Sequence, residues 1–507
     1  MKSANLNAEI IMNNLTERIA ALSPEQRALL DKRLQGNREK SLTLQIITRR
    51  PAGAFCPLSI DQEHLWFLDQ VNPGSFTYNI SASFHLAGPL NRTALEESFN
   101  EVVRRHESLR TTFSSVEGLP HQVIAPSLIL ELPRIDLRHV PEDERTEVLK
   151  QRLAREAQKP FSLSEGPLIR AVLFQVGEAE HRLLMTLHHI VTDRWSYALL
   201  WQELSVLYEA FSKGLPSPLA ELPIQFADFA LWQRQWLKGE TLEARLSYWR
   251  KQLAGASFVL ELPTDRPRPA IQSFRGTRQY RYQSGALWAR LRAMCQQENV
   301  TLYMMLLTAF YVLLYKYTGQ EDIIVGSPYA NRARVETESL IGYLLNMLVL
   351  RVDMSGDPSV RELLGRVRET TTGAFANGEL PFAKLVKELR PERNLSRNPI
   401  FQVSFVFVDY KKTAVGSPQL DQKMINTDSG SVVADLMCGV REHSERPTLL
   451  FEYNVDLFDA ATITRMMIRY ETLLESILSQ PDGRLSTLEM LTEEEKEQQR
   501  KLIRTGE

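Results

Sequence analysis

Residues 182–211 read RLLMTLHHIVTDRWSYALLWQELSVLYEAF and pass from a strand pattern to a helix pattern within a few residues. The apolar run at 182–190 favours a buried β-strand. Residues 197–211 carry apolar side chains at helical spacing, and Gly214 follows them as a helix end. We therefore predict a strand-to-helix turn, which is where α/β proteins often hold reactive side chains.

Strand and helix patterns alternate along most of the chain. A proline-rich stretch, GLPSPLAELPIQFADFALWQ (214–233), interrupts them and predicts a crossing between two halves. Each half is mixed α/β and of similar size, so we expect a pseudo-dimer with a groove between its halves. Further strands are expected at 109–113, 171–176, 322–330, 348–354 and 401–409, and further helices at 95–103, 287–297 and 301–319.

Composition limits the class of protein. A chain of 507 residues is longer than one hydrophobic core usually supports. Its 60 Lys and Arg nearly balance 62 Asp and Glu, and this formal charge of -2 argues against a nucleic-acid surface spread over the whole protein. Cys56, Cys295 and Cys438 predict neither a disulfide framework nor a thiolate zinc site. We find no signal-like or membrane-spanning pattern and expect a cytoplasmic protein.

The N-terminal residues differ from the rest. LSPEQRALLDKRL (22–34) predicts a short helix, with Ser23 as N-cap and Gln26 completing a capping box. Residues 35–55 show no sustained period, so we expect a linker there and a compact domain from near Pro57.

His188 and His189 are the chemically distinctive residues of the predicted turn. Neighbouring side chains of a regular strand point to opposite faces, so this pair cannot share one small ion. His64, His106 and the other histidines have no metal-type spacing, and we predict no metal site. Two interpretations stay open. Either both histidines are hydrogen-bonded polar residues of a strand end, or one faces the groove and the other the interior, which the nearby Asp193 favours.

HHIVTDR (188–194) resembles the His-His-x-x-x-Asp-Gly signature of condensation domains of non-ribosomal peptide synthetases, which are relatives of the chloramphenicol acetyltransferase fold. The resemblance extends, in the family's order, over most of residues 58–480. It implies two chloramphenicol-acetyltransferase-like lobes that form a V-shaped pseudo-dimer with a central tunnel. The other motifs that carry it are LSIDQEHLWFLDQVNPGSFTYNI (58–80), RRHESLRTTF (104–113), IQFADFALWQRQWL (224–237), LIGYLLNMLVLRVD (340–353), LPFAKLVKEL (380–389) and NLSRNPIFQVSF (394–405).

The resemblance also implies a domain order and partners. Residues 1–55 are expected to form a docking helix and linker, 56–222 the N-terminal lobe with the two histidines, 223–480 the C-terminal lobe, and 481–507 a linker toward an adenylation domain. The expected partners are a donor carrier domain on another polypeptide and the acceptor carrier and adenylation domain of the same synthetase. We expect a monomer that binds neither nucleic acid nor membrane. The opening motif is closest to the subtype that joins an L-donor to an L-acceptor.

The reaction implied by the resemblance is amide formation between two carrier-bound substrates. The α-amine of an aminoacyl acceptor attacks an acyl or peptidyl thioester, and both are presented on 4'-phosphopantetheine of carriers, with no cofactor bound by the domain itself. An α-amine has a pKa of about 7.7–8, so a group must take up its proton as the bond forms. The resemblance assigns that position to His189, either as general base or as a hydrogen-bond acceptor that aligns the amine, because positioning alone accelerates aminolysis.

The resemblance suggests supporting roles around the turn. His188 is expected to pack inward. Asp193 is expected to hold the loop through an arginine, with Arg110 as the partner that the family suggests and Arg105 as the competing candidate. An aspartate buried without such a partner would be costly.

Residues beyond the turn are expected to line the channel or to contact carriers. Trp195 and Ser327 are assigned to the channel. Asn346 is expected to bind a thioester arm or the substrate backbone, and an ordinary turn asparagine is a nearly equal alternative. Arg332 and Arg334 are expected to be solvated charges or carrier-docking contacts.

The chain departs from the family pattern at Arg194, where glycine is usual. Glycine permits close backbone passage and positive φ, and arginine does not. Three interpretations follow: Arg194 swings out to solvent, it gates the acceptor channel, or it marks a module that has lost condensation and only recruits carriers. Met347 also replaces a threonine, and Leu344 and Leu345 replace Phe-Val. Retention of both histidines favours catalysis. A coenzyme A-dependent acetyltransferase shares the fold but predicts no adenylation-type tail.

Overall fold

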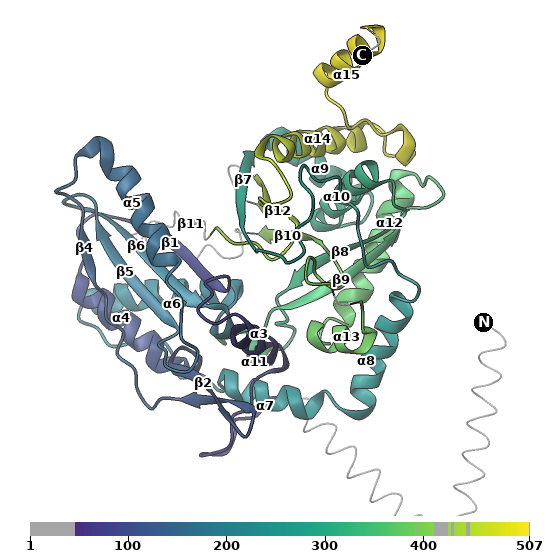
Figure 1. Cartoon of the computed structure of the whole chain (residues 1–507). Helices are drawn as coiled ribbons and strands as arrows, with labels where there is room; N and C mark the ends of the chain where they lie inside the picture. Colours follow the sequence, from purple (N-terminus) through teal and green to yellow (C-terminus); the bar gives the residue numbers. More distant parts are fainter. Residues whose placement is uncertain (1–45, 393, 410–423, 427–429, 443–446, 506–507) are drawn as a thin grey trace, which may run out of the picture.

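The structure is a computed structural model that describes residues 46–505 apart from 393, 410–423, 427–429 and 443–446 (Figure 1). The predicted helix at 22–34 and most of the predicted linker lie outside the described residues. The first described helix is α3 (Ile60–Val71), which begins with a capping box between Ser59 and Gln62. This helix begins three residues after Pro57, near which the sequence predicts the start of the compact domain.

The first lobe is built on a five-stranded sheet in the order β11-β1-β6-β5-β4. β1 (Asn79–Ala87) and β6 (Glu180–His188) pair antiparallel at its centre. β5 (Ile169–Gln175) pairs antiparallel with β6, and β4 (Arg134–Asp136) pairs parallel with β5. The remaining strand, β11 (Met424–Asn426), comes from the second half of the chain and pairs with β1. The two halves of the sequence are therefore joined within one sheet.

Helices cover both faces of this sheet. α4 (Arg92–Arg105) and α6 (Arg194–Ser212) bury an apolar stripe against one face, where Phe84 of β1 belongs to their common core. α5 (Glu142–Ala157) packs against the other face beside Phe174 of β5. Since both faces bury apolar side chains, a register slip by one residue would exchange the side chains of the two faces and disrupt the packing on each.

The second lobe has a six-stranded sheet in the order β7-β13-β12-β10-β8-β9. β10 runs parallel to β12 and β8, and the other neighbours are antiparallel. The strands are β7 (Gly276–Tyr282), β8 (Asp322–Tyr329), β9 (Asn346–Asp353), β10 (Val403–Asp409), β12 (Leu436–Glu442) and β13 (Thr448–Asn454).

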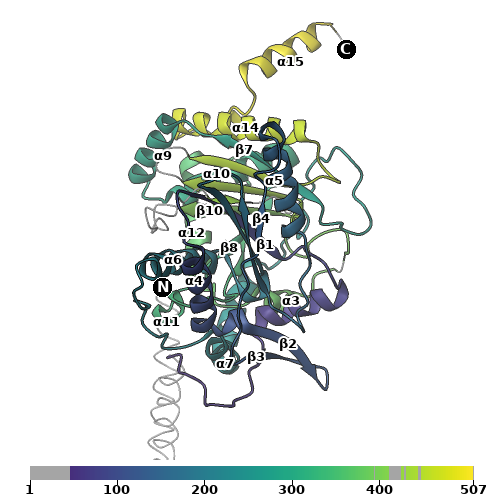
Figure 2. The same ribbon diagram turned by 90° about the vertical axis from the view of Figure 1, so that its left-hand side faces the viewer.

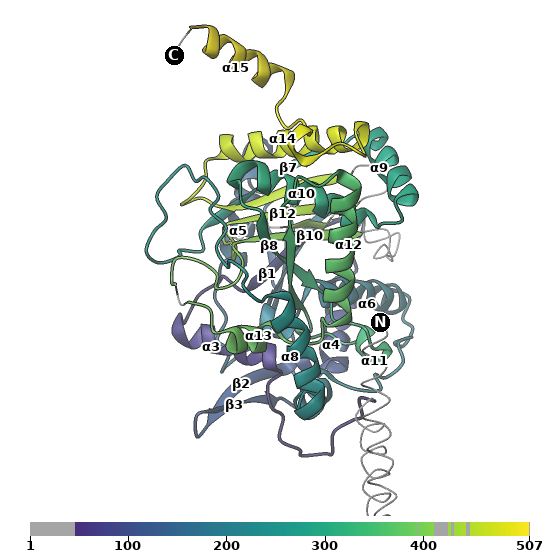
Figure 3. The same cartoon turned by 90° about the vertical axis from the view of Figure 1, so that its right-hand side faces the viewer.

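The core of the second lobe is centred on α10 (Leu302–Thr318), whose residues from Met305 to Leu314 are all buried. A helix that is apolar on every side is expected to lie inside a protein. α9 (Gly285–Gln297), α12 (Val360–Ala376) and α14 (Ala460–Ser479) surround it, and Figure 3 shows them together at the second lobe. Among the described residues no single helix could span a membrane. Only α9 and α10 taken together, across a bend of 104°, have the required length and composition.

Besides the pairing of β11 with β1, the lobes are joined at one end of the molecule. α7 (Phe226–Trp236) runs from the first lobe to α8 (Gly239–Gln252) of the second, and α3 packs on α13 (Phe382–Leu389) (Figure 1). The hairpin of β2 (Thr111–Val116) and β3 (Leu119–Ile124) projects at the same end (Figure 2). The predicted mixed α/β fold of two lobes is confirmed. The domain boundaries and the tunnel stay predictions.

The end of the described chain stands apart. α15 (Glu493–Thr505) extends away from both lobes in all three views. It lies within the segment that the sequence interprets as a linker.

Candidate active site

The strand-to-helix turn is present, and the strand ends two residues earlier than the sequence predicted. β6 ends at His188, a short 3-10 turn covers His189–Val191, and α6 begins at Arg194. The His189 amide donates to the Tyr78 carbonyl at 2.8 Å, and the His189 carbonyl accepts from the Thr192 amide at 3.2 Å. This second bond folds the backbone back on itself, so the ladder cannot continue.

One ring nitrogen of His189, Nε2, is unprotonated and available to accept a proton. Its Nδ1 lies 2.7 Å from the carbonyl oxygen of Thr192. A carbonyl can only accept a hydrogen bond, so Nδ1 carries the proton and Nε2 of the neutral ring keeps its lone pair. Within the described part of the chain, Nε2 has no hydrogen-bond partner. The loop thus fixes the tautomer that a proton acceptor requires.

The surroundings keep the His189 ring neutral. Burial lowers the pKa of His189, while the hydrogen bond to Thr192 and the charge of Asp193 oppose that shift. The residue as a whole is half-buried. A lowered pKa means that the unprotonated ring dominates at neutral pH, which is the form that accepts a proton.

His188 points into the core instead. It is 3% exposed, and its Nδ1 accepts a hydrogen bond from the Ile190 amide at 3.1 Å. Its ring lies 6.2 Å from that of Phe161 and 6.4 Å from that of Tyr78, measured between centroids. Burial is the main cause that lowers its pKa to about 3. The two histidines therefore diverge, one supporting the turn and one presenting its ring nitrogen.

The buried His188 predicts a loss of stability in mild acid. Its folded-state pKa lies below the unfolded value, so between these two pKa values the unfolded chain binds a proton that the folded chain does not. The free energy of unfolding therefore decreases as the pH falls from about 6.5 to about 3. One such proton is worth about 2 kcal/mol between about pH 7 and pH 5. Urea unfolding at the two pH values should show this loss. In His188→Asn, whose oxygen can still accept from the Ile190 amide, the decrease in the free energy of unfolding should be smaller by about 2 kcal/mol. Equal losses in both proteins would contradict a neutral buried His188.

Asp193 is held by Arg332, which corrects the predicted partnership with Arg110. Arg332 Nη2 lies 3.2 Å from both carboxylate oxygens, and the two side chains are 2% and 1% exposed. The same carboxylate caps α6 by accepting from the Ser196 amide at 2.7 Å. Arg332 was expected to be solvated or to contact carriers, and that prediction is wrong because its guanidinium is buried against this aspartate.

The two arginines proposed for Asp193 are used elsewhere. Arg110 donates to the Ala125 carbonyl and lies 3.9 Å from Glu107. Arg105 is buried and forms an ion pair with Glu203 at 3.1 Å. Both arginines therefore stabilise the first lobe through contacts that do not include Asp193.

The segment 340–346, from the second half of the chain, is hydrogen-bonded to the turn. Asp193 Oδ2 accepts from the Leu344 and Leu345 amides at 3.1 and 3.2 Å. Ser196 Oγ donates to the Gly342 carbonyl at 2.9 Å and accepts from the Gly342 amide at 3.1 Å. Gly342 must lack a side chain, because a Cβ there would lie 1.9 Å from the Phe226 ring. These contacts hold Tyr343 over the turn.

Asn346 and Ser327 are buried and satisfied within the protein. Asn346 Nδ2 donates to the carbonyls of Gly378 and Leu380, and its Oδ1 accepts from the Phe382 amide at 2.9 Å. The amide therefore ties β9 to the loop before α13, which fits a structural role better than a substrate contact. Ser327 donates to the Phe405 carbonyl at 3.0 Å and lies 2.8 Å from the Tyr303 hydroxyl, inside the second lobe.

Trp195, Arg194 and Arg334 lie near the lobe boundary. Trp195 is 44% exposed, and its Nε1 donates to the Glu338 carbonyl at 2.9 Å. Arg194 is the half-buried first residue of α6, so its backbone is helical and the positive φ that glycine permits is not needed. The Arg334 guanidinium lies over the Trp232 ring at 4.4 Å, so this arginine is not simply a solvated charge.

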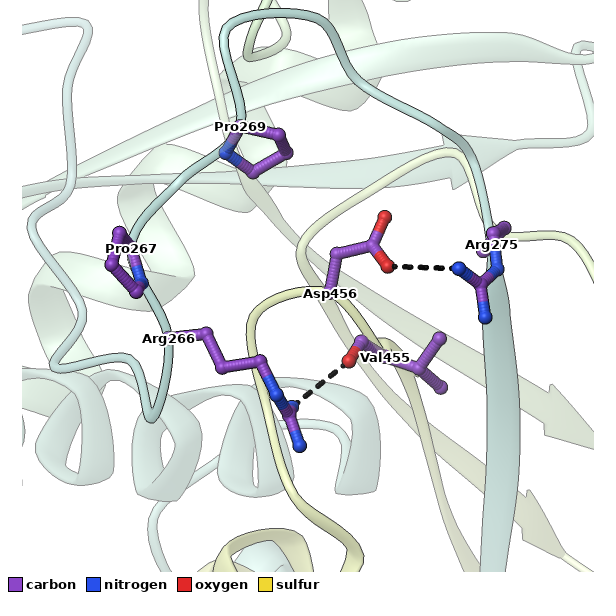
Figure 4. Close-up of a pocket in the computed structure, with 6 residues that line it drawn as sticks. All are labelled: Arg266, Pro267, Pro269, Arg275, Val455 and Asp456. Atoms are coloured by element: carbon purple, nitrogen blue, oxygen red, sulfur yellow. Dashed lines mark hydrogen bonds and ion pairs between the residues drawn. The ribbon is translucent and has the colours of Figure 1, made fainter.

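Two other kinds of site receive no support. Among the described residues, no group of three or more His, Cys, Asp or Glu side chains could hold a metal ion. A hollow of about 610 Å³ lies on the second lobe (Figure 4). Its two arginines are engaged, Arg266 with the Val455 carbonyl at 3.0 Å and Arg275 with Asp456 at 3.5 Å. It contains none of the residues of the turn.

Comparison with known proteins gives one consistent family. The family model of the Condensation domain matches residues 53–500. A linear gramicidin synthase protein of Brevibacillus parabrevis is 45% identical over 444 residues, which are 87% of this chain and 6% of that protein. Phosphinothricin tripeptide synthetase PhsC of Streptomyces viridochromogenes is 39% identical over 485 residues, which are 96% of this chain and 45% of that protein. The chain spans less than a tenth of three gramicidin synthase proteins and less than half of PhsC.

Solved structures share the fold. The X-domain from teicoplanin biosynthesis has a TM-score of 0.79 at 27% identity, covering 88% of this chain and 100% of that one. The condensation domain of the monacolin K polyketide synthase MokA has a TM-score of 0.75 at 22% identity, covering 85% and 99%.

Proposed function

The chain belongs to the condensation-domain family, and from that premise we propose that it joins a carrier-bound acyl or peptidyl thioester to a carrier-bound aminoacyl acceptor, with His189 at the reacting amine. The observation that carries this assignment is the bare Nε2 of His189, whose tautomer is fixed by the Thr192 carbonyl. Of the two histidines, His189 presents a ring nitrogen to receive a proton, while His188 is enclosed.

The proposed step needs one proton acceptor and no redox partner. The lone pair of the acceptor amine attacks the thioester carbonyl carbon and forms the C–N bond. As the tetrahedral intermediate collapses, the C–S bond breaks and the thiolate of the donor arm leaves. The surplus proton of the amine passes to His189 Nε2 and from there to the thiolate, so that charge and atoms balance. Holding both arms in line supplies much of the acceleration in such a reaction.

The proposal includes the partners. Both substrates are presented on 4'-phosphopantetheine of carrier domains, the donor carrier on another polypeptide and the acceptor carrier and adenylation domain in the same synthetase. An L-donor and L-acceptor, a monomeric state and a cytoplasmic location complete the proposal. The family membership and the relation to gramicidin synthase proteins support the carrier-bound substrates. Peptide formation from two loaded carriers, with native chain and His189→Ala, is the test.

A substitution at Arg194 tests whether the chain catalyses condensation or only recruits carriers. We expect the native chain to form product, and Arg194→Gly to change its rate by less than about tenfold, since a helical first residue uses no glycine freedom. Glycine in the first turn should lower the free energy of unfolding by at most about 1 kcal/mol. The measurement is single-turnover product formation for both proteins, with unfolding curves alongside. A native chain that is inactive until Arg194→Gly is made would instead identify Arg194 as a gate.

A further inference from the structure

Tyr343 makes the aromatic contact of His189. The two ring centroids are 4.8 Å apart, and the ring planes meet at 67°. This edge-to-face arrangement is a favoured aromatic geometry, worth about 0.5–1.5 kcal/mol beyond simple burial. Tyr343 is half-buried, so its ring both contacts the imidazole and borders accessible space. An imidazole with one hydrogen bond, at Nδ1, needs a second contact to fix the direction of its Nε2.

The backbone on both sides of Tyr343 is bound to the turn itself. Gly342 exchanges two hydrogen bonds with the Ser196 hydroxyl, and Leu344 and Leu345 donate to the Asp193 carboxylate. The ring therefore cannot shift along the turn without breaking bonds on at least one side. Ile341, one residue before these hydrogen-bonded positions, lies in the core of the first lobe. The position of Tyr343 over His189 thus depends on how the second half of the chain seats on the first lobe.

The groups that face this pair come from several elements. His188 and Asp193 lie on the same turn as His189, and Asp61 of α3 and Tyr78, just before β1, face Tyr343. Burial raises the pKa of Asp61 to about 7 and the pKa of Tyr78 to about 12, so Tyr78 is neutral at physiological pH. Removing the Tyr343 ring would hydrate the imidazole, and hydration favours its charged form.

We propose that Tyr343 is a positioning residue, whose ring aims the Nε2 of His189 at the acceptor amine and couples that aim to the seating of segment 340–346 on the first lobe. This inference rests on the proposed function. The hydroxyl group has no part in it, so a phenylalanine should serve as well. Tyr343 makes no covalent or proton-transfer step of its own.

The test compares Tyr343→Leu with Tyr343→Phe in peptide formation from two loaded carriers. Tyr343→Leu should lower kcat at least about tenfold with little change in KM for either carrier, because misdirecting a reacting group by about 1 Å can cost up to about a hundredfold. It should also move the acid limb of the pH–rate profile to higher pH, as the pKa of His189 returns toward about 6.5. Tyr343→Phe should restore both quantities to near the native values.

Two further measurements keep the test decisive. NMR titration of His189 in the native chain, Tyr343→Leu and Tyr343→Phe reads the ring's pKa without any turnover, so it separates a failure of this inference from a failure of the proposed function. Phe375→Leu, which removes a ring that packs on Tyr303 and Tyr329, is the matched control and should leave the rate and profile unchanged. Tyr343→Met replaces Tyr343→Leu if the latter does not fold.

Three results would overturn the role of Tyr343. They are an unchanged kcat in Tyr343→Leu, a reduced kcat with neither the acid limb nor the NMR titration moved, and a loss in Tyr343→Phe as large as in Tyr343→Leu.

Discussion

Replacing His189 by alanine is expected to lower the rate of amide formation by about 10²–10⁴-fold, the range that a positioned acid–base group supplies. Alanine removes the Nε2 acceptor but leaves the rest of the turn, since Asp193 and His188 keep their own partners. The measurement is single-turnover peptide formation at saturating loaded carriers. The effect should fall on kcat, because the backbone hydrogen bonds of residue 189 to Tyr78 and Thr192, which hold the turn, remain in the alanine variant.

Two matched variants sharpen this experiment. His139→Ala removes an exposed histidine of a loop and should leave the rate unchanged. His189→Gln, whose amide reaches the position of Nε2, retains an oxygen that accepts a hydrogen bond but cannot take up a proton at neutral pH. A rate near native for His189→Gln would make alignment the main role, whereas a loss like that of alanine would make proton uptake the main role. Native turnover in His189→Ala would remove His189 from the mechanism.

Asp193→Ala is expected to reduce the free energy of unfolding by about 3–5 kcal/mol, since removing one member of a buried ion pair leaves the other charge uncompensated. The loss includes the N-cap of α6, which is worth about 1 kcal/mol. It also strips the Leu344 and Leu345 amides of their acceptor. Denaturant unfolding measures the change, provided that the transition stays two-state.

A double-mutant cycle identifies the partner of Asp193. Arg332→Met should cost a similar amount, and Asp193→Ala with Arg332→Met should cost less than the two single changes added together. The same cycle with Arg110→Met should be additive, because Arg110 bonds to Ala125 and lies beside Glu107. Coupling of Asp193 to Arg110, together with additivity for Arg332, would instead support Arg110 as the partner, as the sequence predicted.

The arrangement of the turn was predictable from the sequence because the local pattern contains it. An apolar run of strand length, two histidines, a nearby aspartate and a following helical pattern at 197–211 indicate the strand, the turn and the helix. The role of Asp193 as the N-cap of α6 was seen only in the structure. The divergence of His188 and His189 follows from the strand geometry up to His188. The two-residue error in the strand end arises from the Tyr78 and Thr192 contacts, which involve positions that no local pattern relates.

The partner of Asp193 could not be predicted, because it depends on distance in space. Arg110 and Arg105 stood as candidates, and the family resemblance favoured Arg110. A buried aspartate demands a cation, but the sequence contains no measure of which arginine the second half of the chain brings to it. Arg332 lies 139 positions away along the chain. Tyr343 was missed for the same reason, since nothing in IGYLLN distinguishes it from an ordinary core aromatic. Its role becomes visible only from the hydrogen bonds that Ser196 and Asp193 make to the residues on either side of it.

The most direct measurement is a crystal structure of the chain with a non-hydrolysable aminoacyl-pantetheine amide in place of the acceptor thioester. The account predicts that the free amine lies within about 2.6–3.2 Å of His189 Nε2, the reach of a hydrogen bond to a base. An aminoacyl group bound with its amine directed away from His189, or an arm that enters elsewhere on the protein, would contradict it.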